Sequence, residues 1–520
     1  MTRPMLLSSL SRRTFLAGGA AAGALAVSGG WSRVLAAPLL TVESVTLDVN
    51  GKAAKVFAVK GPTGEGIFAK EGDRLTSAVL NASQAPAVMH WHGQVFAPAD
   101  QDRARPDGGE LAPGGTDRVD FLLTPGTHWM HSHTLNEQQL LAAPLVTREA
   151  DAGDAQDVVV MLHDFSFRTP EEILAGLGGA GAQGGHGAHG MGQQMQGTTG
   201  MAMSGMDHSG HGMTGMGAMG GGMSGGGMSG TGMPGNGMSG AGHGMDGGMG
   251  GMMAHANDVD YDAFLANRRT LADPEVVQVE KGGRVRLRII NGGTATAFFI
   301  SVPGLKPRCI AVDGSPCAPI EAEAFPMAQG QRIDLLVDIP ASGGAFPVLA
   351  QVEASPRRTG LVLATAGASV ARIAETADRA QGLLDLAFEA RLSAGKPLAA
   401  RKADKAFPIM LGEEAGYRWT INGRTYAEAA PFVVSPGERV EMTFMNPTTM
   451  NHPMHLHGHH FQVVGIGGRR FSGAVRDTVM VPPHMPVTIA FDAGPKGEWF
   501  LHCHHLYHMA TGMMAVVKVA

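Results

Sequence analysis

The chain ends with the stretch that decides its fold, His502-Cys503-His504-His505-Leu506-Tyr507-His508, followed five residues later by Met513. A cysteine, a histidine five residues on and a methionine ten residues on are the residue types of a blue-copper site, which needs a thiolate, imidazole and a weak axial thioether. Side chains alternate between the two faces of a strand, so His502 and His504 share the face opposite Cys503. These two imidazoles can therefore bind a second metal centre one covalent step from the first.

Three further histidine clusters repeat the H-x-H spacing. They are His90-Trp91-His92, His131-Ser132-His133 and His452-Pro453-Met454-His455-Leu456-His457. In a strand, each H-x-H pair places two imidazoles on one face about 6–7 Å apart, which suits two neighbouring metals better than one. If the blue-copper site takes His452, Cys503, His508 and Met513, eight histidines remain as four pairs. Eight imidazoles can serve three more coppers and leave coordination positions open for dioxygen.

In these four motifs, taken in chain order, the sequence resembles the multicopper oxidases. The resemblance extends over essentially the whole ordered chain. It implies an all-β fold of three cupredoxin-like Greek-key β-sandwiches and four copper ions, namely one type 1, one type 2 and a type 3 pair. It assigns His90 and His455 to the type 2 copper. It assigns the type 3 pair to two sets, His92, His131 and His504 on one metal and His133, His457 and His502 on the other.

The resemblance also implies a reaction. Substrate is oxidised one electron at a time at the type 1 copper, electrons pass through Cys503, and dioxygen is reduced to water. Asp107, in Arg105-Pro106-Asp107-Gly108-Gly109, resembles the acidic residue that family members place near the cluster to deliver protons, although a turn aspartate is the alternative. Met509 stands where many relatives have a second acid. Arg476-Asp477-Thr478 matches a segment that recurs in the family. A purely structural role within the third domain is one interpretation of this segment.

The length of 520 residues favours about three domains. Composition and turn signals place them at residues 38–177, 257–371 and 406–520, with a linker at 372–405. A short helix is expected from Thr169-Pro170, with Thr169 as N-cap. Residues 178–256 are rich in glycine, methionine and histidine, and we expect this insertion to be disordered. Cys309 and Cys317 flank the predicted turn Asp313-Gly314 and form either a cross-hairpin disulfide or two reduced thiols.

The first residues have the pattern of an export signal. Ser11-Arg12-Arg13-Thr14-Phe15-Leu16 is a twin-arginine motif, an apolar run follows it, and Val34-Leu35-Ala36 offers a cleavage site before Ala37. Residues 1–36 are thus predicted to be a signal peptide, and the mature chain is predicted to be a periplasmic monomer without a stable membrane anchor. The net charge of −6 gives no reason to expect nucleic acid as a partner.

The methionine-rich insertion bears on the electron donor. Sixteen of the 32 methionines lie between Met191 and Met253, alongside several histidines. Thioether and imidazole suit the soft ion Cu(I), so the insertion favours a periplasmic cuprous oxidase with a role in copper tolerance. Two alternatives stay open: a laccase-like oxidase of phenols or Mn(II), and a copper-sequestering protein with incidental oxidase activity. An axial methionine such as Met513 generally gives the type 1 copper a lower reduction potential than a non-coordinating leucine or phenylalanine does. This favours an easily oxidised donor such as Cu(I).

Overall fold

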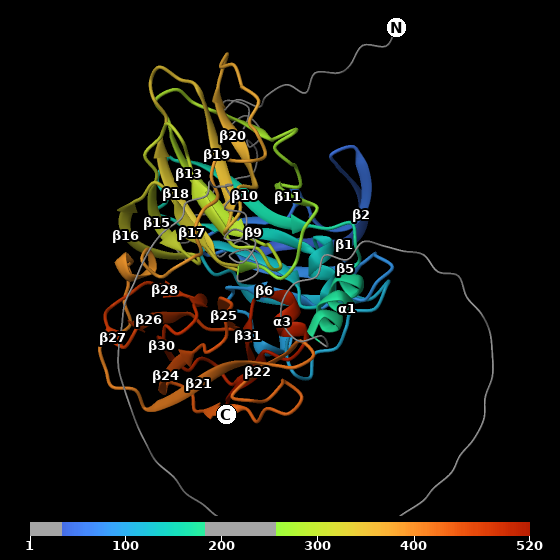
Figure 1. The fold of residues 1–520 in the computed structure, drawn as a ribbon, viewed down its shortest axis with the longest axis vertical. Helices are drawn as coiled ribbons and strands as arrows, with labels where there is room; N and C mark the ends of the chain where they lie inside the picture. Colours follow the sequence, from blue (N-terminus) through green and yellow to red (C-terminus); the bar gives the residue numbers. More distant parts are fainter. Residues whose placement is uncertain (1–33, 182–255) are drawn as a thin grey trace, which may run out of the picture.

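The computed structural model describes residues 34–181 and 256–520 (Figure 1). Within these ranges the regular secondary structure is almost all strand, arranged in six sheets. Most of the predicted signal peptide, and the insertion apart from its two ends, lie outside the described residues. No helix in the described ranges is long and apolar enough to cross a membrane.

The first pair of sheets holds two of the four histidine motifs. One sheet has the order β3-β2-β1-β5-β7 and the other β4-β9-β8-β6. In β5 every second residue is buried, because alternate side chains point between the two sheets. The strands are β1 (Val34–Val49), β2 (Lys52–Gly61), β3 (Gly64–Glu65), β4 (Ile67–Lys70), β5 (Arg74–Asn81), β6 (Met89–His92), β7 (Thr116–Leu122), β8 (Gly126–Ser132) and β9 (Ala142–Arg148).

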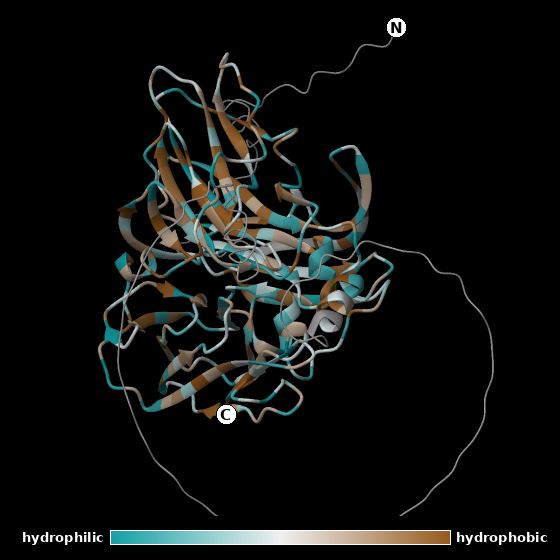
Figure 2. Ribbon diagram, in the orientation of Figure 1, coloured by the Kyte–Doolittle hydropathy of each residue, from teal (hydrophilic) through white to brown (hydrophobic). Residues whose placement is uncertain are grey.

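The second pair carries no histidine motif. Its sheets have the orders β11-β10-β13-β18-β15-β16 and β12-β20-β19-β14-β17. Apolar stretches run along β13, β18 and β19 at its centre (Figure 2). The strands are β10 (Gln156–Phe165), β11 (Ala263–Ala266), β12 (Val276–Val279), β13 (Arg284–Asn291), β14 (Phe298–Ser301), β15 (Arg308–Val312), β16 (Ser315–Glu321), β17 (Phe325–Met327), β18 (Arg332–Asp338), β19 (Ala345–Val352) and β20 (Arg358–Thr365).

The third pair holds the other two motifs. Its sheets have the orders β22-β21-β24-β30-β26-β27, with β28 paired to β26, and β23-β32-β31-β25-β29. The strands are β21 (Lys405–Glu414), β22 (Arg418–Ile421), β23 (Phe432–Val434), β24 (Arg439–Met445), β25 (His452–Leu456), β26 (Phe461–Ile466), β27 (Arg469–Arg470), β28 (Val475–Arg476), β29 (Thr478–Val481), β30 (Val487–Asp492), β31 (Gly497–Cys503) and β32 (Met514–Val519).

One boundary differs from the sequence-based division. Strand β10 was placed in the first domain, residues 38–177, but it pairs in parallel with β13 and antiparallel with β11, inside the second pair of sheets. The chain therefore enters the second sandwich before the insertion and returns to the same sheet after it. An apolar strand pattern marks a buried strand but carries no information about which neighbour it pairs with.

The expected helix is present as α1 (Pro170–Gly181). Thr169 caps it, because Glu172 N donates to Thr169 Oγ1 at 3.2 Å while Thr169 N donates to Glu172 Oε2 at 2.8 Å. This reciprocal pair is a capping box. The shorter helical elements are η2 (Ala99–Gln101), η3 (Leu135–Gln139), η4 (Glu389–Arg391) and α3 (Leu506–Ala510).

Cys309 and Cys317 lie on the paired strands β15 and β16, as the expected hairpin requires. Both are buried and free, with their sulfur atoms 3.8 Å apart. The structure therefore has the reduced alternative. The predicted linker 372–405 has no strand before β21 begins at Lys405, and it packs through the buried side chains of Leu384, Leu386 and Phe388.

Candidate metal centres

One centre lies where β25 begins, β31 ends and α3 passes. Nδ1 of His452 and Nδ1 of His508 are each 3.7 Å from Cys503 Sγ, and the two nitrogens are 3.2 Å apart. Met513 is fully buried, and its backbone bonds to both Cys503 and His508. Two imidazole nitrogens and a thiol that converge in this way match the trigonal donor set of a blue-copper site.

The thiol at this centre is shielded from water. Burial raises the pKa of Cys503, so the sulfur carries a proton when no metal is bound. A copper ion must displace that proton, because the thiolate is the ligand. The nearby Thr448 hydroxyl is 2.8 Å from Nε2 of His452, which leaves Nδ1 of that ring directed at the sulfur.

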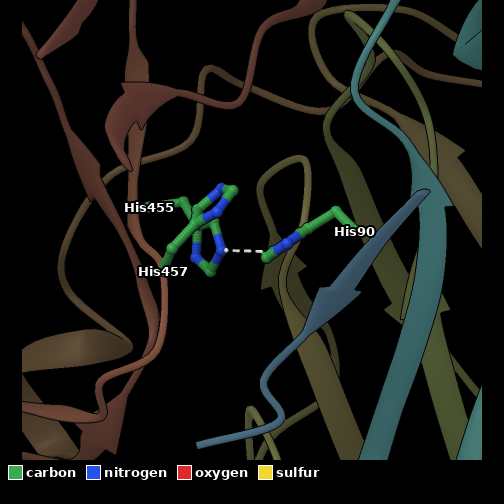
Figure 3. Close-up of side chains that lie close together, drawn as sticks. All are labelled: His90, His455 and His457. Atoms are coloured by element: carbon green, nitrogen blue, oxygen red, sulfur yellow. Dashed lines mark hydrogen bonds between the residues drawn. The ribbon is translucent and has the colours of Figure 1, made fainter. Parts of the chain in front are cut away.

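The second centre lies between the first and third pairs of sheets. Strand register sets His90 opposite His131 on β6 and β8, and sets His455 opposite His502 on β25 and β31. The two strand pairs face each other, and His90 Nε2 comes to 3.3 Å from His455 Nε2 (Figure 3). Imidazoles from the first and third pairs of sheets therefore converge on one buried site.

The other predicted cluster histidines join this centre. His502 Nε2 is 3.2 Å from His133 Nε2 and 3.1 Å from His457 Nε2, and these three residues coincide with one of the predicted type 3 ligand sets. His92 Nδ1 is 3.4 Å from His131 Nε2. The structure thus gathers the eight histidines, while the division of single rings among single coppers stays a prediction.

The donor set fits copper on two observations. Burial, reinforced by neighbouring imidazoles, lowers the pKa of most of the cluster rings, and that of His502 falls to about 3. Neutral rings offer a lone pair to a metal. In addition, His504 Nε2 is buried without a hydrogen-bond partner in the described part of the chain, a costly arrangement that a metal bond would relieve.

Three buried carboxylates contact the outer nitrogens of the cluster rings. Asp102 Oδ2 is 2.7 Å from Nδ1 of His90, and Glu137 Oε2 is 3.0 Å from Nδ1 of His131. Asp477 Oδ1 is 3.1 Å from Nε2 of His92. Such partners orient metal-binding imidazoles and select their tautomer.

The predicted proton-delivering residue, Asp107, is not among these carboxylates. Its side chain is 85% exposed, forms an ion pair with Arg105 and lines an open cleft at the surface. Asp102, five residues earlier in the same loop, contacts the cluster instead. Burial raises its pKa to about 8. The structure therefore corrects the assignment of Asp107, because the loop turns inward at Asp102 and back to solvent before residue 107.

A further group of side chains lies at the outer edge of the first centre. Nε2 of His508 is buried without a hydrogen-bond partner and lies 3.7 Å from Asp258 Oδ2. His505 stacks on His508 with ring centroids 3.8 Å apart, and its Nε2 is 3.1 Å from Asp258 Oδ1. Tyr417 donates to the same carboxylate. Sequence reasoning did not single out Asp258 or His505, although His505 stands inside the terminal motif.

Comparison with known proteins identifies the family of the chain. Family models described as multicopper oxidase match residues 41–150, 231–371 and 400–520. The multicopper oxidase MmcO of Mycobacterium tuberculosis is 28% identical over 491 residues, covering 91% of this chain and 85% of that protein. Copper resistance protein A of Escherichia coli is 24% identical over 643 residues, covering 99% of this chain and 100% of that protein.

Fold, donor set and comparisons together define a copper-dependent oxidase. The chain belongs to the multicopper oxidase family. Enzymes of this family use type 1, type 2 and type 3 coppers, and they couple a reducing substrate to dioxygen.

Solved structures show the same fold at low identity. The laccase from Botrytis aclada aligns with a TM-score of 0.70 and 19% identity, covering 94% of this chain and 88% of that one. Fet3p, described as a multicopper oxidase that functions in iron import, aligns with a TM-score of 0.67 and 16% identity, covering 92% of this chain and 90% of that one. The three pairs of sheets are therefore cupredoxin-like β-sandwiches, as predicted.

Proposed function

We propose that this oxidase takes Cu(I) as its electron donor, works in the periplasm after twin-arginine export, and contributes to copper tolerance. The balanced reaction is 4 Cu⁺ + O₂ + 4 H⁺ → 4 Cu²⁺ + 2 H₂O. The observation that carries the choice of donor is the group formed by Asp258 and His505 beside the outer edge of His508.

This group has the chemistry of a cation site. Asp258 supplies a negative charge, and His505 supplies an imidazole whose Nε2 lies 3.1 Å from Asp258 Oδ1 and whose Nδ1 lacks a hydrogen-bond partner among the described residues. Imidazole is a suitable ligand for copper ions. A carboxylate attracts a cation by charge, whereas it offers a neutral phenol only a hydrogen bond. His505 stacks on His508, which is a predicted ligand of the type 1 copper. A cation bound to His505 would therefore be separated from that ligand only by the His505 ring.

The methionine-rich insertion is tethered close to this group. Met252, Met253 and His255 precede Asp258 by three to six residues. A segment with many weak Cu(I) ligands that joins the chain so few residues before Asp258 would raise the local concentration of the ion. The names of the copper resistance relatives support the same proposal.

Residues of the chain connect the two centres. Cys503 belongs to the first centre, and its neighbours His502 and His504 belong to the second, so the backbone and side chains form a continuous covalent path. When bound, the coppers supply the one-electron steps and the place where dioxygen is reduced. Asp102 contacts His90 at 2.7 Å and is the carboxylate placed to pass protons toward that reaction.

A laccase-like oxidase of phenols or Mn(II) is the second candidate, because several relatives and solved structures are named laccases. The two candidates differ in what they require of Asp258. We expect Asp258→Asn to raise the KM for Cu(I) about tenfold, equivalent to about 1.4 kcal/mol of binding. In the same variant, turnover of a phenol is expected to change by less than about twofold.

The measurement is steady-state oxygen consumption with Cu(I), with a phenol and with Mn(II). Asp260→Asn is a matched control, since Asp260 lies two residues away with a side chain 95% exposed. The proposal that Cu(I) binds beside Asp258 would be contradicted by an unchanged KM for Cu(I) in Asp258→Asn. A larger loss of activity with the phenol than with Cu(I) would also contradict it.

A further inference from the structure

Arg332, the first residue of β18 in the second domain, is fully buried and bonds to the two other domains. Its Nη1 and Nη2 donate to Oδ1 and Oδ2 of Asp477, in the third domain, at 2.6 and 2.5 Å. Its Nε donates to the carbonyl oxygen of Thr127, in the first domain, at 3.1 Å. A bidentate arginine–carboxylate pair holds both partners in one plane and one orientation.

Asp477, held in this orientation, contacts two histidines of the cluster. Its Oδ1 is 3.1 Å from Nε2 of His92, and its carbonyl oxygen is 2.8 Å from Nδ1 of His455. A carboxylate and a carbonyl only accept hydrogen bonds, so His92 carries its proton on Nε2 and His455 carries its proton on Nδ1. The opposite nitrogens, Nδ1 of His92 and Nε2 of His455, are then unprotonated and face the cluster.

The backbone of Arg332 is held by a turn of the same domain. Arg332 N donates to Oδ1 of Asp313 at 2.8 Å, and Asp313 N donates to the carbonyl oxygen of Arg332 at 3.0 Å. Asp313 sits at the tip of the β15–β16 hairpin with φ of +47°, followed by Gly314 with φ of +75°. The guanidinium therefore extends from a fixed point in the second sandwich.

Glycine is required at two positions, one beside this contact and one against the ring of His504. A side-chain carbon at Gly93, next to His92, would lie 2.8 Å from Arg332 Nη2 and 3.0 Å from Asp477 Oδ2. A side-chain carbon at Gly330 would lie 2.5 Å from the ring of His504. Both glycines have positive φ. The loop before β18 thus packs against one cluster imidazole directly and reaches two others through Asp477.

We infer that residues 330–332 of the second domain, which supplies no predicted copper ligand, position the trinuclear cluster, with Arg332 as the positioning residue. The Arg332–Asp477 pair sets the tautomer and direction of His92 and His455, and Gly330 sets the plane of His504. This inference concerns the oxygen-reducing centre and does not depend on the electron donor.

Arg288 provides a matched comparison. It is also a fully buried arginine of the second domain, it forms ion pairs with Glu149, Asp157 and Asp334, and it donates to Thr127 Oγ1 at 3.0 Å. Within the described part of the chain, its hydrogen bonds and ion pairs reach neither Asp477 nor a cluster histidine. Loss of a buried ion pair lowers stability at either position. Loss of cluster geometry is expected only at Arg332.

The experiment loads purified Arg332→Lys, Arg288→Lys and unmodified protein with copper under one protocol. Copper per chain, the blue type 1 absorption, the type 2 paramagnetic resonance signal and the near-ultraviolet type 3 absorption are measured. Lysine keeps the charge but lacks the two-pronged geometry. We expect Arg332→Lys to weaken retention of the cluster coppers roughly 10–100-fold, as loss of an outer hydrogen bond to a ligand does, with type 1 absorption unchanged.

Arg288→Lys is expected to unfold at lower temperature with normal cluster signals. Cluster signals that are normal in Arg332→Lys, or lost equally in both variants, would overturn the inference. If Arg332→Lys lacks the blue absorption that reports a folded third domain, Gly330→Ala tests the same loop. It is expected to change the type 3 signal through His504, and an unchanged type 3 signal in a folded Gly330→Ala protein would also overturn the inference.

Discussion

At the scale of single residues, the clustering of the histidines was easier to predict from sequence than the buried residues that contact them. The histidines could be predicted because two imidazoles in an H-x-H strand share a face whatever surrounds the strand. Asp107 was misassigned because the path of the loop after β6 depends on tertiary packing, which turns Asp102 inward. Arg332 gave no signal of its own, since its partner Asp477 is 145 residues away.

The corrected carboxylate leads to a prediction at this scale. Asp102→Asn keeps an oxygen near Nδ1 of His90 but removes the carboxyl group that accepts and releases a proton. We expect oxygen reduction to slow roughly 10²-fold, within the usual range for a lost proton-transfer group. Reduction of the type 1 copper without oxygen should proceed at the normal rate. Stopped-flow absorption separates the two steps.

The control for this prediction is Asp107→Asn, which alters an exposed side chain in the same loop. It should change oxygen reduction less than about twofold. A slow Asp107→Asn enzyme together with a fast Asp102→Asn enzyme would restore the assignment made from sequence.

At the scale of elements, local signals were reliable and pairing was not. The start of α1 followed from Thr169 and Pro170, because a capping box involves only neighbouring residues. The partner of β10 did not follow, because parallel pairing with β13 joins segments separated by the whole insertion. The register that aligns β25 with β31 likewise became visible only in the folded sheet.

The contact between the second domain and the linker, residues 372–405, leads to a prediction of pH dependence. Burial raises the pKa of Glu353 to about 7, and Glu353 Oε1 accepts hydrogen bonds from Leu384 N and Asn451 Nδ2. A folded-state pKa above the unfolded value of about 4.3 means that the folded state binds the proton more tightly. The contribution of Glu353 to the free energy of unfolding is therefore fully present below pH 4.3 and is lost as the pH rises toward 7.

Glu353→Gln keeps an oxygen for both hydrogen bonds and cannot ionise. At pH 8 we expect its free energy of unfolding to exceed that of the unmodified protein by up to about 3 kcal/mol, with the difference vanishing near pH 4. Urea unfolding followed by tryptophan fluorescence at both pH values measures this. A variant that is less stable at pH 8 would contradict the prediction.

At the scale of the whole molecule, the predicted copper ligands come from the first and third sandwiches, while the second contributes Arg332 and the loop at Gly330. The number of domains and the position of the cluster followed from the family resemblance, which assigns histidines of the first and third domains to the same coppers. The part played by the second sandwich could not, since it depends on buried contacts between distant residues.

The role in copper tolerance is also a property of the whole protein. Cys503→Ser removes the sulfur that joins the two centres but leaves the methionine-rich insertion intact. If oxidation protects the cell, this variant should fail to restore growth in copper to a strain lacking the gene. Growth equal to that of the unmodified protein, at equal periplasmic abundance, would favour sequestration.

The measurement that tests the central claim most directly is oxygen consumption with Cu(I) as the only donor, comparing the intact protein with a form lacking residues 182–255. The account predicts one dioxygen consumed for every four Cu(I) oxidised, and a Cu(I) turnover that falls much more than phenol turnover when the insertion is removed. No consumption with Cu(I) alongside rapid consumption with a phenol, or equal effects of the deletion on both donors, would contradict it.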